Sequence, residues 1–403
     1  MSGAVVDPRM TPGRARPVQR MAWRWSDPRF RNIVWQVAIV GGVALIAYLL
    51  VTQLNANLAA RHIATGFAFL HQAAAIPIGE TPIAYTPSVS TYGRALFIGV
   101  LNTLRVAVVG VVLTTILGTF VGIMRLSPNG LAARLSAVYV EVLRDIPVLL
   151  QLLFWFGLLQ MLPGPRQAFR PAPDVFLSNR GVMLPALDWR AAHSWAVLAF
   201  LLGVAGVIGV GRYAARRQGE TGMRPVTWPV SVALLVGLPV LVWAALGAPF
   251  RVQVPVLRGF NFQGGLTVSP EYTALLLGLV VYTSSYIAEI VRSGIEAVPV
   301  GQWEAAGALG LSRGQVLRQV VLPQALRVIV PPMTSQYLNL IKNSSLAVAI
   351  GYQDIVSIAD TTLNQTGQAI EGVGIIMAVY LCFSLSISLV MNWYNARIAL
   401  VER

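Results

Sequence analysis

The chain has 403 residues, of which 56% are hydrophobic and only 11% are charged. Soluble globular domains carry about 25% charged residues, so this composition excludes an ordinary water-soluble protein and predicts a membrane protein. The one cysteine, Cys382, excludes an intramolecular disulfide. The formal net charge of +14 comes almost entirely from arginine, because Lys342 is the only lysine.

Eight segments are apolar for long enough to cross a bilayer, which takes about 20 residues. In chain order they run over 33–52, 96–124, 138–162, 195–211, 228–247, 272–291, 325–347 and 373–396, and the fourth is the shortest. The first follows an arginine-rich N-terminal segment, 1–32, and is too long for the core of a cleaved signal peptide. We therefore interpret it as a retained anchor in an all-α polytopic membrane protein.

The arginines predict the orientation, because Lys and Arg gather on the cytoplasmic side of a membrane protein. With the N-terminus inside, 18 arginines fall in cytoplasmic segments and 8 fall in outer loops. The last outer loop, 348–372, has none and carries Asp354, Asp360 and Glu371. Both termini are thus expected inside, and the positive charge is explained by topology and by lipid headgroups rather than by nucleic acid.

The loop between the sixth and seventh spans, "VGQWEAAGALGLSRGQVLRQVVLPQAL", is polar and punctuated by glycine. A short helix is expected over "QWEAAGAL", and Gly310 is placed to end it in the left-handed conformation. Ser312 and Gln315 have the spacing of a capping box, so a second helix should begin there. Pro323 can open the next span, because the first turn of a helix needs no N–H from it.

The same loop resembles the EAA loop of the permease subunits of binding-protein-dependent ABC importers. Glu304-Ala305-Ala306, Gly310, Val320 and Leu322-Pro323 have that spacing, although isoleucine is commoner than valine at position 320. "YVEVLRDIPVLLQLLFWFGLL" and "LPQALRVIVPPMTSQYLNLIKNSSLAVAIGYQDI" resemble the polar amino-acid uptake branch of the family. With "NLAARHIATGFAFLHQAAAIPIG" before the core, the chain is most similar to the long, broad-specificity L-amino-acid permeases of this branch.

The resemblance implies a type I ABC importer permease core with extra spans, about eight transmembrane helices in all. The core would comprise 96–162 and 271–396, including the coupling loop 300–323. The other parts would be the cytoplasmic N-terminus 1–32, the extra helix 33–52, the periplasmic loop 53–95, an insertion with two helices at 163–270 and the cytoplasmic C-terminus 397–403.

The resemblance also implies the partners and the reaction. The permease would lie in the bacterial inner membrane and pair with a second, related permease, in a heterodimer. It would bind a dimer of cytoplasmic ATP-binding subunits and receive L-amino acids from a periplasmic binding protein. Transport would follow alternating access. Because the phosphate-binding P-loop needs a lysine and the only one is Lys342, ATP and Mg²⁺ would be bound by the partner ATPase and no cofactor by this chain.

Two sets of residues are candidate sites. The resemblance implies an ATPase-coupling role for Glu304, Ala305, Ala306, Gly310, Leu322 and Pro323. Arg105 and Lys342 lie inside predicted spans, where a charge is costly and indicates a pathway or a buried pair. Together with Ser344 and Ser345 they could meet the substrate carboxylate. The alternatives are an arginine that extends to the outer headgroups and a polar cap at the outer end of a helix.

Further charged pairs lie at the ends of predicted spans. Glu141 and Arg144, and likewise Glu289 and Arg292, are three residues apart, a spacing that suits local salt bridges at the ends of spans. The three histidines are scattered and predict no metal site. The alternative function is an ion-gradient-driven transporter or channel, which would favour inverted repeats and acids in the middle of spans. Neither is evident, and no cluster of the kind that a membrane enzyme needs is present.

Overall fold

The computed structural model describes residues 28–60, 65–223 and 225–398, which fall into two units, 1–65 and 66–403. In the first unit it describes one helix, α1 (Pro28–Ala60). Residues 31–53 of α1 are long and apolar enough to cross a membrane. This helix contains the first predicted span, as the interpretation of a membrane anchor requires.

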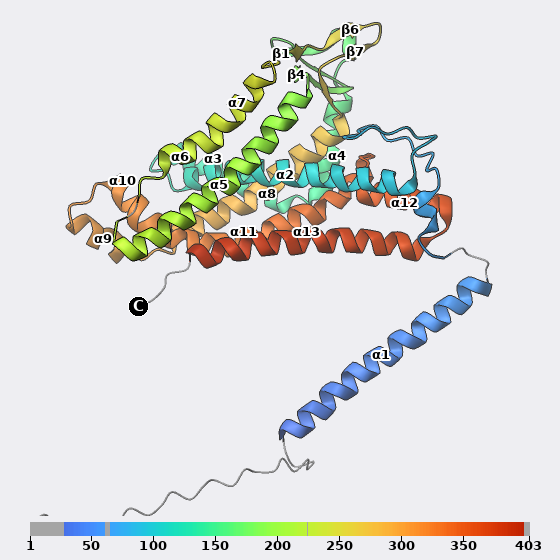
Figure 1. Ribbon diagram of the computed structural model, residues 1–403, viewed down its shortest axis with the longest axis horizontal. Helices are drawn as coiled ribbons and strands as arrows, with labels where there is room; N and C mark the ends of the chain where they lie inside the picture. The colour runs from blue at the N-terminus through green and yellow to red at the C-terminus, as the bar shows by residue number, and fades with distance from the viewer. Residues whose placement is uncertain (1–27, 61–64, 224, 399–403) are drawn as a thin grey trace, which may run out of the picture. The chain divides into compact units, whose positions relative to one another are not determined.

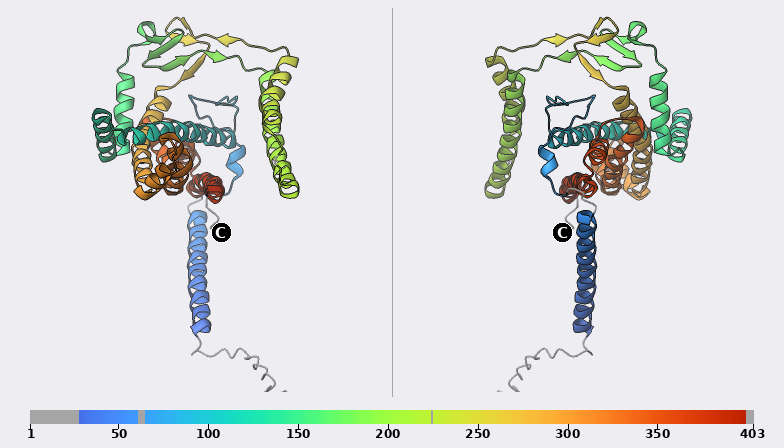
Figure 2. Two further views of the ribbon diagram at one scale, coloured as in Figure 1. Left: turned by 90° about the vertical axis from the view of Figure 1, so that its left-hand side faces the viewer. Right: turned by 90° about the vertical axis from the view of Figure 1, so that its right-hand side faces the viewer.

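The central helix of the second unit is α8 (Pro270–Glu296), which crosses the middle of this unit (Figures 1 and 2). It packs against α2 (Tyr92–Arg125), α3 (Gly130–Asp145), α4 (Val148–Gln160) and α11 (Leu322–Asn343). Further out, α12 (Ile355–Thr366) packs against α2, and α13 (Ala369–Ile398) packs against α11 and α12. The most extensive contact joins α2 to α8. It is close because Gly122 has no side chain: a Cβ there would lie 2.7 Å from the carbonyl oxygen of Ala288.

The third predicted span is broken in two. Helices α3 and α4 meet at an angle of 104°. Ile146 precedes Pro147, and a residue before proline avoids the helical conformation. The buried side chain of Gln151 donates to the carbonyl oxygens of Leu143, at 2.8 Å, and Ile146, at 3.0 Å. These bonds satisfy carbonyl groups that the break leaves without a helical partner. The break between α3 and α4 is therefore stabilised by the fold.

The described residues contain six helices that could cross a membrane, or seven if the bent pair α3–α4 is one span. The seventh predicted span, 325–347, is helical as α11, but α11 is not among them. Polar residues interrupt it, including Gln336, Asn339 and Lys342. The helical membrane architecture is thus confirmed, while the prediction of a continuous third span is wrong and α11 is less apolar than a simple span.

The insertion at 163–270 has a longer first helix and more regular structure than its sequence predicts. Helix α5 (Ala191–Thr221) extends well beyond the short fourth span, and it pairs with α6 (Trp228–Val232), the π-helical turn Ala233–Gly237 and α7 (Leu238–Ala245). Figure 2 shows this hairpin beside the other helices, joined to them by short strands. The strands were not foreseen by the sequence analysis.

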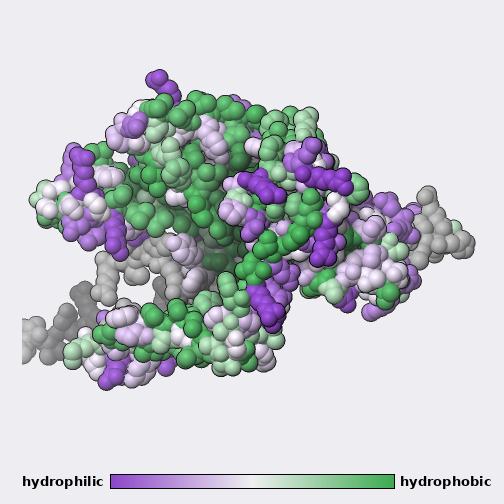
Figure 3. All heavy atoms as spheres, turned by 90° about the horizontal axis from the view of Figure 1, so that it is seen from above, coloured by the Kyte–Doolittle hydropathy of each residue, from purple (hydrophilic) through white to green (hydrophobic). Residues whose placement is uncertain are grey.

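The strands form three small antiparallel sheets. They are β1 (Phe169–Ala172), β2 (Val175–Ser178), β3 (Gly181–Leu184), β4 (Ala186–Leu187), β5 (Val252–Gln253), β6 (Val256–Arg258), β7 (Asn261–Gln263) and β8 (Leu266–Val268). One sheet has the order β1-β2-β3-β8, and the others are β4-β5 and β6-β7. The space-filling view in Figure 3 shows apolar surface along the helices and hydrophilic surface gathered in separate patches.

Candidate functional site

The coupling loop has the local structure that its sequence predicts. Helix α9 (Val300–Ala308) is followed by Gly310, whose φ is +76°. The Gly310 N–H donates to the Gly307 carbonyl at 2.9 Å, and the Leu311 N–H donates to the Ala306 carbonyl at 3.4 Å. This pair of bonds is a Schellman motif, which needs a left-handed residue and so favours glycine.

A second short helix follows, α10 (Arg313–Val316). The Ser312 N–H donates to the side chain of Gln315 at 2.9 Å, so the capping box is confirmed. Helix α10 continues through a π-helical turn, Leu317–Val321, into α11. Pro323 lies in the first turn of α11, where its missing N–H costs little. The loop thus reaches the membrane helix through an unbroken helical path.

The two faces of α9 differ. The Ala306 side chain is buried in a cluster that includes Val298, Val316 and Val321, which fixes α9 on the helices below it. Glu304 and Ala305 are exposed. So are the large apolar residues Val300, Trp303 and Leu309, with exposed fractions of 69%, 36% and 81%. An exposed face of this kind, held on a rigid base, is suited to contact another protein. Leu322 is exposed as well, and Pro323 is half-buried.

A cavity of about 290 Å³ lies between α8 and α11. It is lined entirely by polar or hydroxyl-bearing residues: Tyr282, Thr283, Tyr286, Gln336, Asn339 and Asn343. The hydroxyl groups of Tyr282 and Tyr286 share a hydrogen bond of 3.1 Å. The amides of α11 recur at positions i, i+3 and i+7, so they share one helix face. Such a lining provides hydrogen-bonding partners for a polar molecule inside a membrane protein.

A cation stands beside this cavity because α3 ends there. The guanidinium of Arg144, in the last turn of α3, lies 4.9 Å above the ring of Tyr286. Among the described residues no carboxylate pairs with Arg144 within 4.0 Å, so the predicted salt bridge to Glu141 is wrong. The parallel prediction is confirmed: Arg292 contacts Glu289 at 2.5 Å. The break after α3 therefore places an unneutralised guanidinium at the middle of α8.

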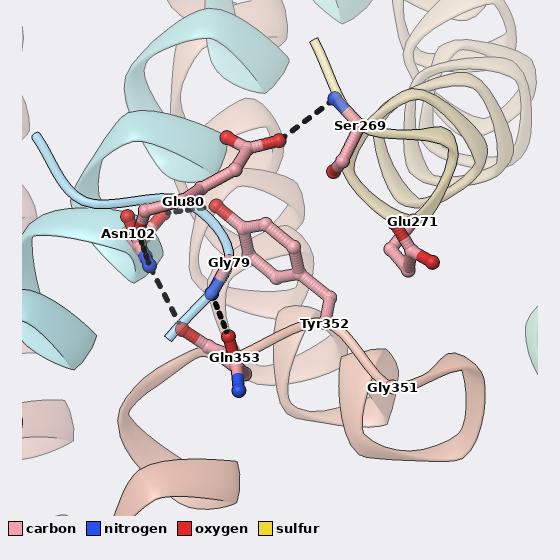
Figure 4. A pocket seen from close by; sticks show the side chains of 8 residues that line it. All are labelled: Gly79, Glu80, Asn102, Ser269, Glu271, Gly351, Tyr352 and Gln353. Carbon is pink, nitrogen blue, oxygen red and sulfur yellow. Dashed lines mark hydrogen bonds between the residues drawn. The ribbon is translucent and has the colours of Figure 1, made fainter. Parts of the chain in front are cut away.

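Arg105 lies near the start of α8, at the end of the helices that the arginine count predicts to be outer. Its guanidinium is 2.5 Å from the carboxylate of Glu80 and 4.3 Å above the ring of Tyr272. Figure 4 shows the Glu80 carboxylate turned toward Ser269, whose N–H donates to it at 2.9 Å. These residues border a cavity of about 320 Å³, lined by Gly79, Glu80, Asn102, Ser269, Glu271, Gly351, Tyr352 and Gln353. Arg105 is thus one half of a partly buried ion pair.

The other three candidate pathway residues do not join Arg105. Ser344 donates to the carbonyl of Ile341 at 2.7 Å, and Ser345 donates to the carbonyl of Lys342 at 2.7 Å. Both hydroxyls are therefore used by the preceding helical turn. The Lys342 side chain is exposed, and no hydrogen bond or ion pair links it to Arg105 in the described part of the chain. α11 gives way to a 3-10 turn at Ser344, so an interruption of the helix there was correctly expected.

The residues of the cavity between α8 and α11 were missed by the sequence analysis, although a signal was present. Tyr282 and Tyr286 are four residues apart in a predicted span, and Gln336, Asn339 and Asn343 recur along another. Such spacing places the polar groups of each helix on one face. These side chains are neutral, so they do not stand out in an apolar span as a formal charge does.

A family match to part of the chain and similarity to nearly full-length relatives point to the same family. Residues 208–400 match the family described as binding-protein-dependent transport system inner membrane component. The chain is 49% identical to YhdX of Escherichia coli K12, whose name assigns it to an amino-acid ABC transporter, with 94% of this chain and 97% of YhdX covered. It is 48% identical to the general L-amino acid transport system permease protein AapQ of Rhizobium johnstonii, with 96% and 98% covered.

A third relative has a narrower named range of substrates. The chain is 41% identical to BztB of Rhodobacter capsulatus, a glutamate/glutamine/aspartate/asparagine transport system permease protein, with 95% of this chain and 97% of BztB covered. All three relatives are matched over almost their full length, so the inserted hairpin and strands fall within the matched region.

Proposed function

The chain belongs to the family of inner-membrane components of binding-protein-dependent transport systems, and we propose that it is the permease subunit of an ATP-driven importer of L-amino acids. It is a multi-pass protein of the inner membrane, and importers of this family work with an ATPase and a soluble binding protein. The observation that carries the proposal is α9, an exposed helix on a buried base at the place where the family's coupling loop is expected. Similarity to YhdX, AapQ and BztB supports amino acids as the substrates.

The coupling residues would act as follows. Glu304 and Ala305 lie on the exposed surface of α9 and would enter a groove of the ATPase, while Ala306 holds α9 in place. Gly310 lets the chain turn, and Leu322 and Pro323 set where α11 begins. ATP and Mg²⁺ would be bound and used by the ATPase, and this chain would catalyse no reaction. Closure of the ATPase dimer would then move α9 and α11 as one unit.

Substitution of Glu304 tests this assignment. Glu304→Lys reverses a charge on the exposed surface and should weaken ATPase association or uncouple ATP hydrolysis from uptake, with normal membrane insertion. Glu220→Lys is a matched control, because Glu220 is an exposed acid in α5, on the same predicted side of the membrane. Normal ATPase binding and full uptake with Glu304→Lys would remove Glu304 from the coupling surface.

The cavity between α8 and α11 is the substrate pathway that the structure supports best. An amino acid carries a carboxylate and an ammonium group, and both need fixed partners once water is removed. Arg144 would meet the carboxylate, because it is a cation beside the cavity without a carboxylate partner among the described residues. The amide oxygens of Gln336, Asn339 and Asn343 would accept from the ammonium group. Lys342 follows Asn339 by one helical turn and would be a second cation on this route.

Uptake by variants separates these residues. A hydrogen bond to a charged group contributes roughly 1.5–3 kcal/mol, so its loss should lower uptake about tenfold or more. Arg144→Leu should impair uptake of all amino acids alike, because every one has the carboxylate, and Lys342→Met should have a smaller effect. Asn339→Leu should impair uptake as well. Unchanged uptake by Arg144→Leu at matched membrane levels would refute the assignment of Arg144.

The second permease would be a related chain rather than an identical one, because two copies of the long form would duplicate every insertion. Co-purification of the intact complex followed by mass spectrometry tests this arrangement, and two copies of the same permease would contradict it. The same purification separates an ATP-driven importer from an ion-gradient-driven transporter or channel. The latter would be recovered without an ATPase, and its uptake would follow the ion gradient in the absence of ATP.

A further inference from the structure

The inserted strands form a small folded unit of their own. Two stretches separated by the α5–α7 hairpin, 163–190 and 250–268, come together in it. Val182 of β3 pairs with Val268 of β8, and Ala186 of β4 pairs with Gln253 of β5. Phe176, Met183 and Phe262 form its buried cluster. We call this unit, residues 163–190 and 250–268, the strand unit. It connects α4, α5, α7 and α8, and Figure 1 shows it at the ends of these helices.

The strand unit concentrates positive charge on the side of the membrane where arginine is usually scarce. It holds Arg166, Arg170, Arg180, Arg190, Arg251 and Arg258, all of which are exposed. Against these stand only two acids, Asp174 and Asp188. Asp188 forms a salt bridge with Arg190, at 3.0 Å. Six of the eight outer arginines are therefore gathered in one small fold, which a topological role for arginine does not explain.

Two of these arginines are held in place at a groove. A cavity of about 350 Å³ is lined by Arg166, Arg170 and Asp174 together with apolar residues of the strands. The Arg166 guanidinium lies 4.1 Å above the ring of Phe260, and its Nε donates to the Gly259 carbonyl at 3.4 Å. The Arg170 guanidinium lies 5.0 Å above the ring of Phe176. Stacking fixes a guanidinium while leaving N–H groups at its edge free for a carboxylate.

The surroundings of the groove have the composition of a protein interface. Arginine and aromatic residues are enriched where proteins bind each other, and pre-ordered side chains lose less entropy on binding. Beside Arg166 the Phe260 side chain is 74% exposed. An exposed ring next to fixed guanidinium groups suits a protein surface that offers both carboxylates and apolar contacts, whereas lipid headgroups are bound mainly by charge.

We propose that this groove is a docking surface for acidic side chains of the soluble binding protein. The inference rests on the proposed function, which supplies a soluble partner on the outer side. Carboxylates of the partner would pair with Arg166 and Arg170, and its apolar side chains would cover Phe260. The strand unit would thus hold the binding protein over the permease while substrate is released.

The test measures the affinity of the transporter's own binding protein for the full permease–ATPase complex in phosphatidylcholine nanodiscs. Arg166→Glu/Arg170→Glu should weaken binding about tenfold or more, since it replaces two attractive charges by repulsive ones. Arg180→Glu/Arg251→Glu is the matched control, because it makes the same change of charge in the strand unit away from the groove. The control should change the affinity less than about threefold. Arg166→Gln/Arg170→Gln should give an intermediate loss and serves if charge reversal prevents assembly.

Several results would overturn the inference. Groove variants with wild-type affinity would do so. An equal loss in the control would also do so, because it would assign the effect to overall charge. If the groove variants keep the affinity but bind less phosphatidylglycerol when it is added to the nanodiscs, the ligand is a lipid headgroup and the inference is wrong. A wild-type complex that neither binds a binding protein nor imports amino acids would instead contradict the proposed function.

Discussion

Arg105 and Glu80 should behave as a structural tie and not as part of the substrate pathway. Their side chains are 30% and 13% exposed, and the pair joins the segment before α2 to α2 itself. Replacing Arg105 by Met leaves a mostly buried carboxylate with the Ser269 N–H as its remaining donor. Removing one partner of a fully buried ion pair lowers the free energy of unfolding by about 3–5 kcal/mol. Because this site is partly exposed, we expect a loss of about 2 kcal/mol.

The reverse change should cost less. In Glu80→Gln the side chain still accepts from Ser269, and the Arg105 guanidinium keeps its place over Tyr272 and its access to water. We expect Glu80→Gln to lower the free energy of unfolding by about 1 kcal/mol. The loss in the double variant should be smaller than the sum of the two single losses by roughly 1 kcal/mol or more. The exposed pair of Arg190 and Asp188 is the control, where the coupling should be about 0.5 kcal/mol or less.

Thermal unfolding of the purified complex measures the cycle, and uptake at matched membrane levels measures the function. At roughly 2–4 °C per kcal/mol, Arg105→Met should lower the melting temperature by about 4–8 °C. The double variant should recover part of that loss and most of the uptake. If the stability losses of the two single variants simply add in the double variant, the stabilising interaction between Arg105 and Glu80 is refuted. If the double variant stays inactive although it is stable, Arg105 itself handles the substrate.

Three further predictions concern single positions. Burial raises the pKa of Asp354 to about 7, above its ordinary value, so the folded protein keeps a proton that the unfolded chain releases. Stability should therefore fall by on the order of 2 kcal/mol between about pH 5 and pH 7 and level off above, and Asp354→Asn should abolish this fall in thermal scans; equal slopes for both proteins would contradict it. Gly310→Val should weaken ATPase association in a pulldown, because its φ of +76° strains a branched side chain, while Val at the unstrained Gly314 should not; equal binding by both would refute this. In a Cys382→Ser background, an impermeant thiol reagent should label a cysteine at 180 but not at 217 in intact cells, and the opposite pattern would reverse the topology.

The coupling loop could be predicted from sequence because its determinants are local. The left-handed turn at Gly310, the capping box of Ser312 and Gln315, and the ion pair of Glu289 and Arg292 each depend on residues at most five apart. Backbone geometry and side-chain spacing settle such features whatever the rest of the fold does.

The candidate site was harder to predict because tertiary contacts decide it. Arg105 lies deep in a long apolar run, but α2 is 34 residues long, and Glu80 and Tyr272 hold its guanidinium near the start of α8. Arg144 was assigned to the inner end of a continuous span, whereas the break at Pro147 puts it beside Tyr286. Pro147 by itself predicts a bend in this apolar run, and the Gln151 side chain then satisfies the carbonyls that the break leaves open.

The strands of the insertion were missed for a related reason. Strands of two to four residues carry too little alternation of polar and apolar residues to be recognised beside long spans. Pairing between β3 and β8 also joins segments on either side of a hairpin of two helices, which no local pattern announces. These strands carry the exposed arginines. In the sequence the arginines are visible only as a departure from the usual charge distribution, and their grouping in one small fold is not.

The central claim is that this chain forms the membrane pathway of an ATP-driven amino-acid importer. The most direct measurement is uptake of radiolabelled L-amino acids by proteoliposomes that contain the chain, its partner permease and its ATPase, with binding protein added outside and ATP enclosed. Uptake should require ATP and the binding protein, should persist when ionophores remove the ion gradients, and should be lost in Arg144→Leu and uncoupled in Glu304→Lys. Uptake that ignores ATP but follows an imposed ion gradient would contradict the account.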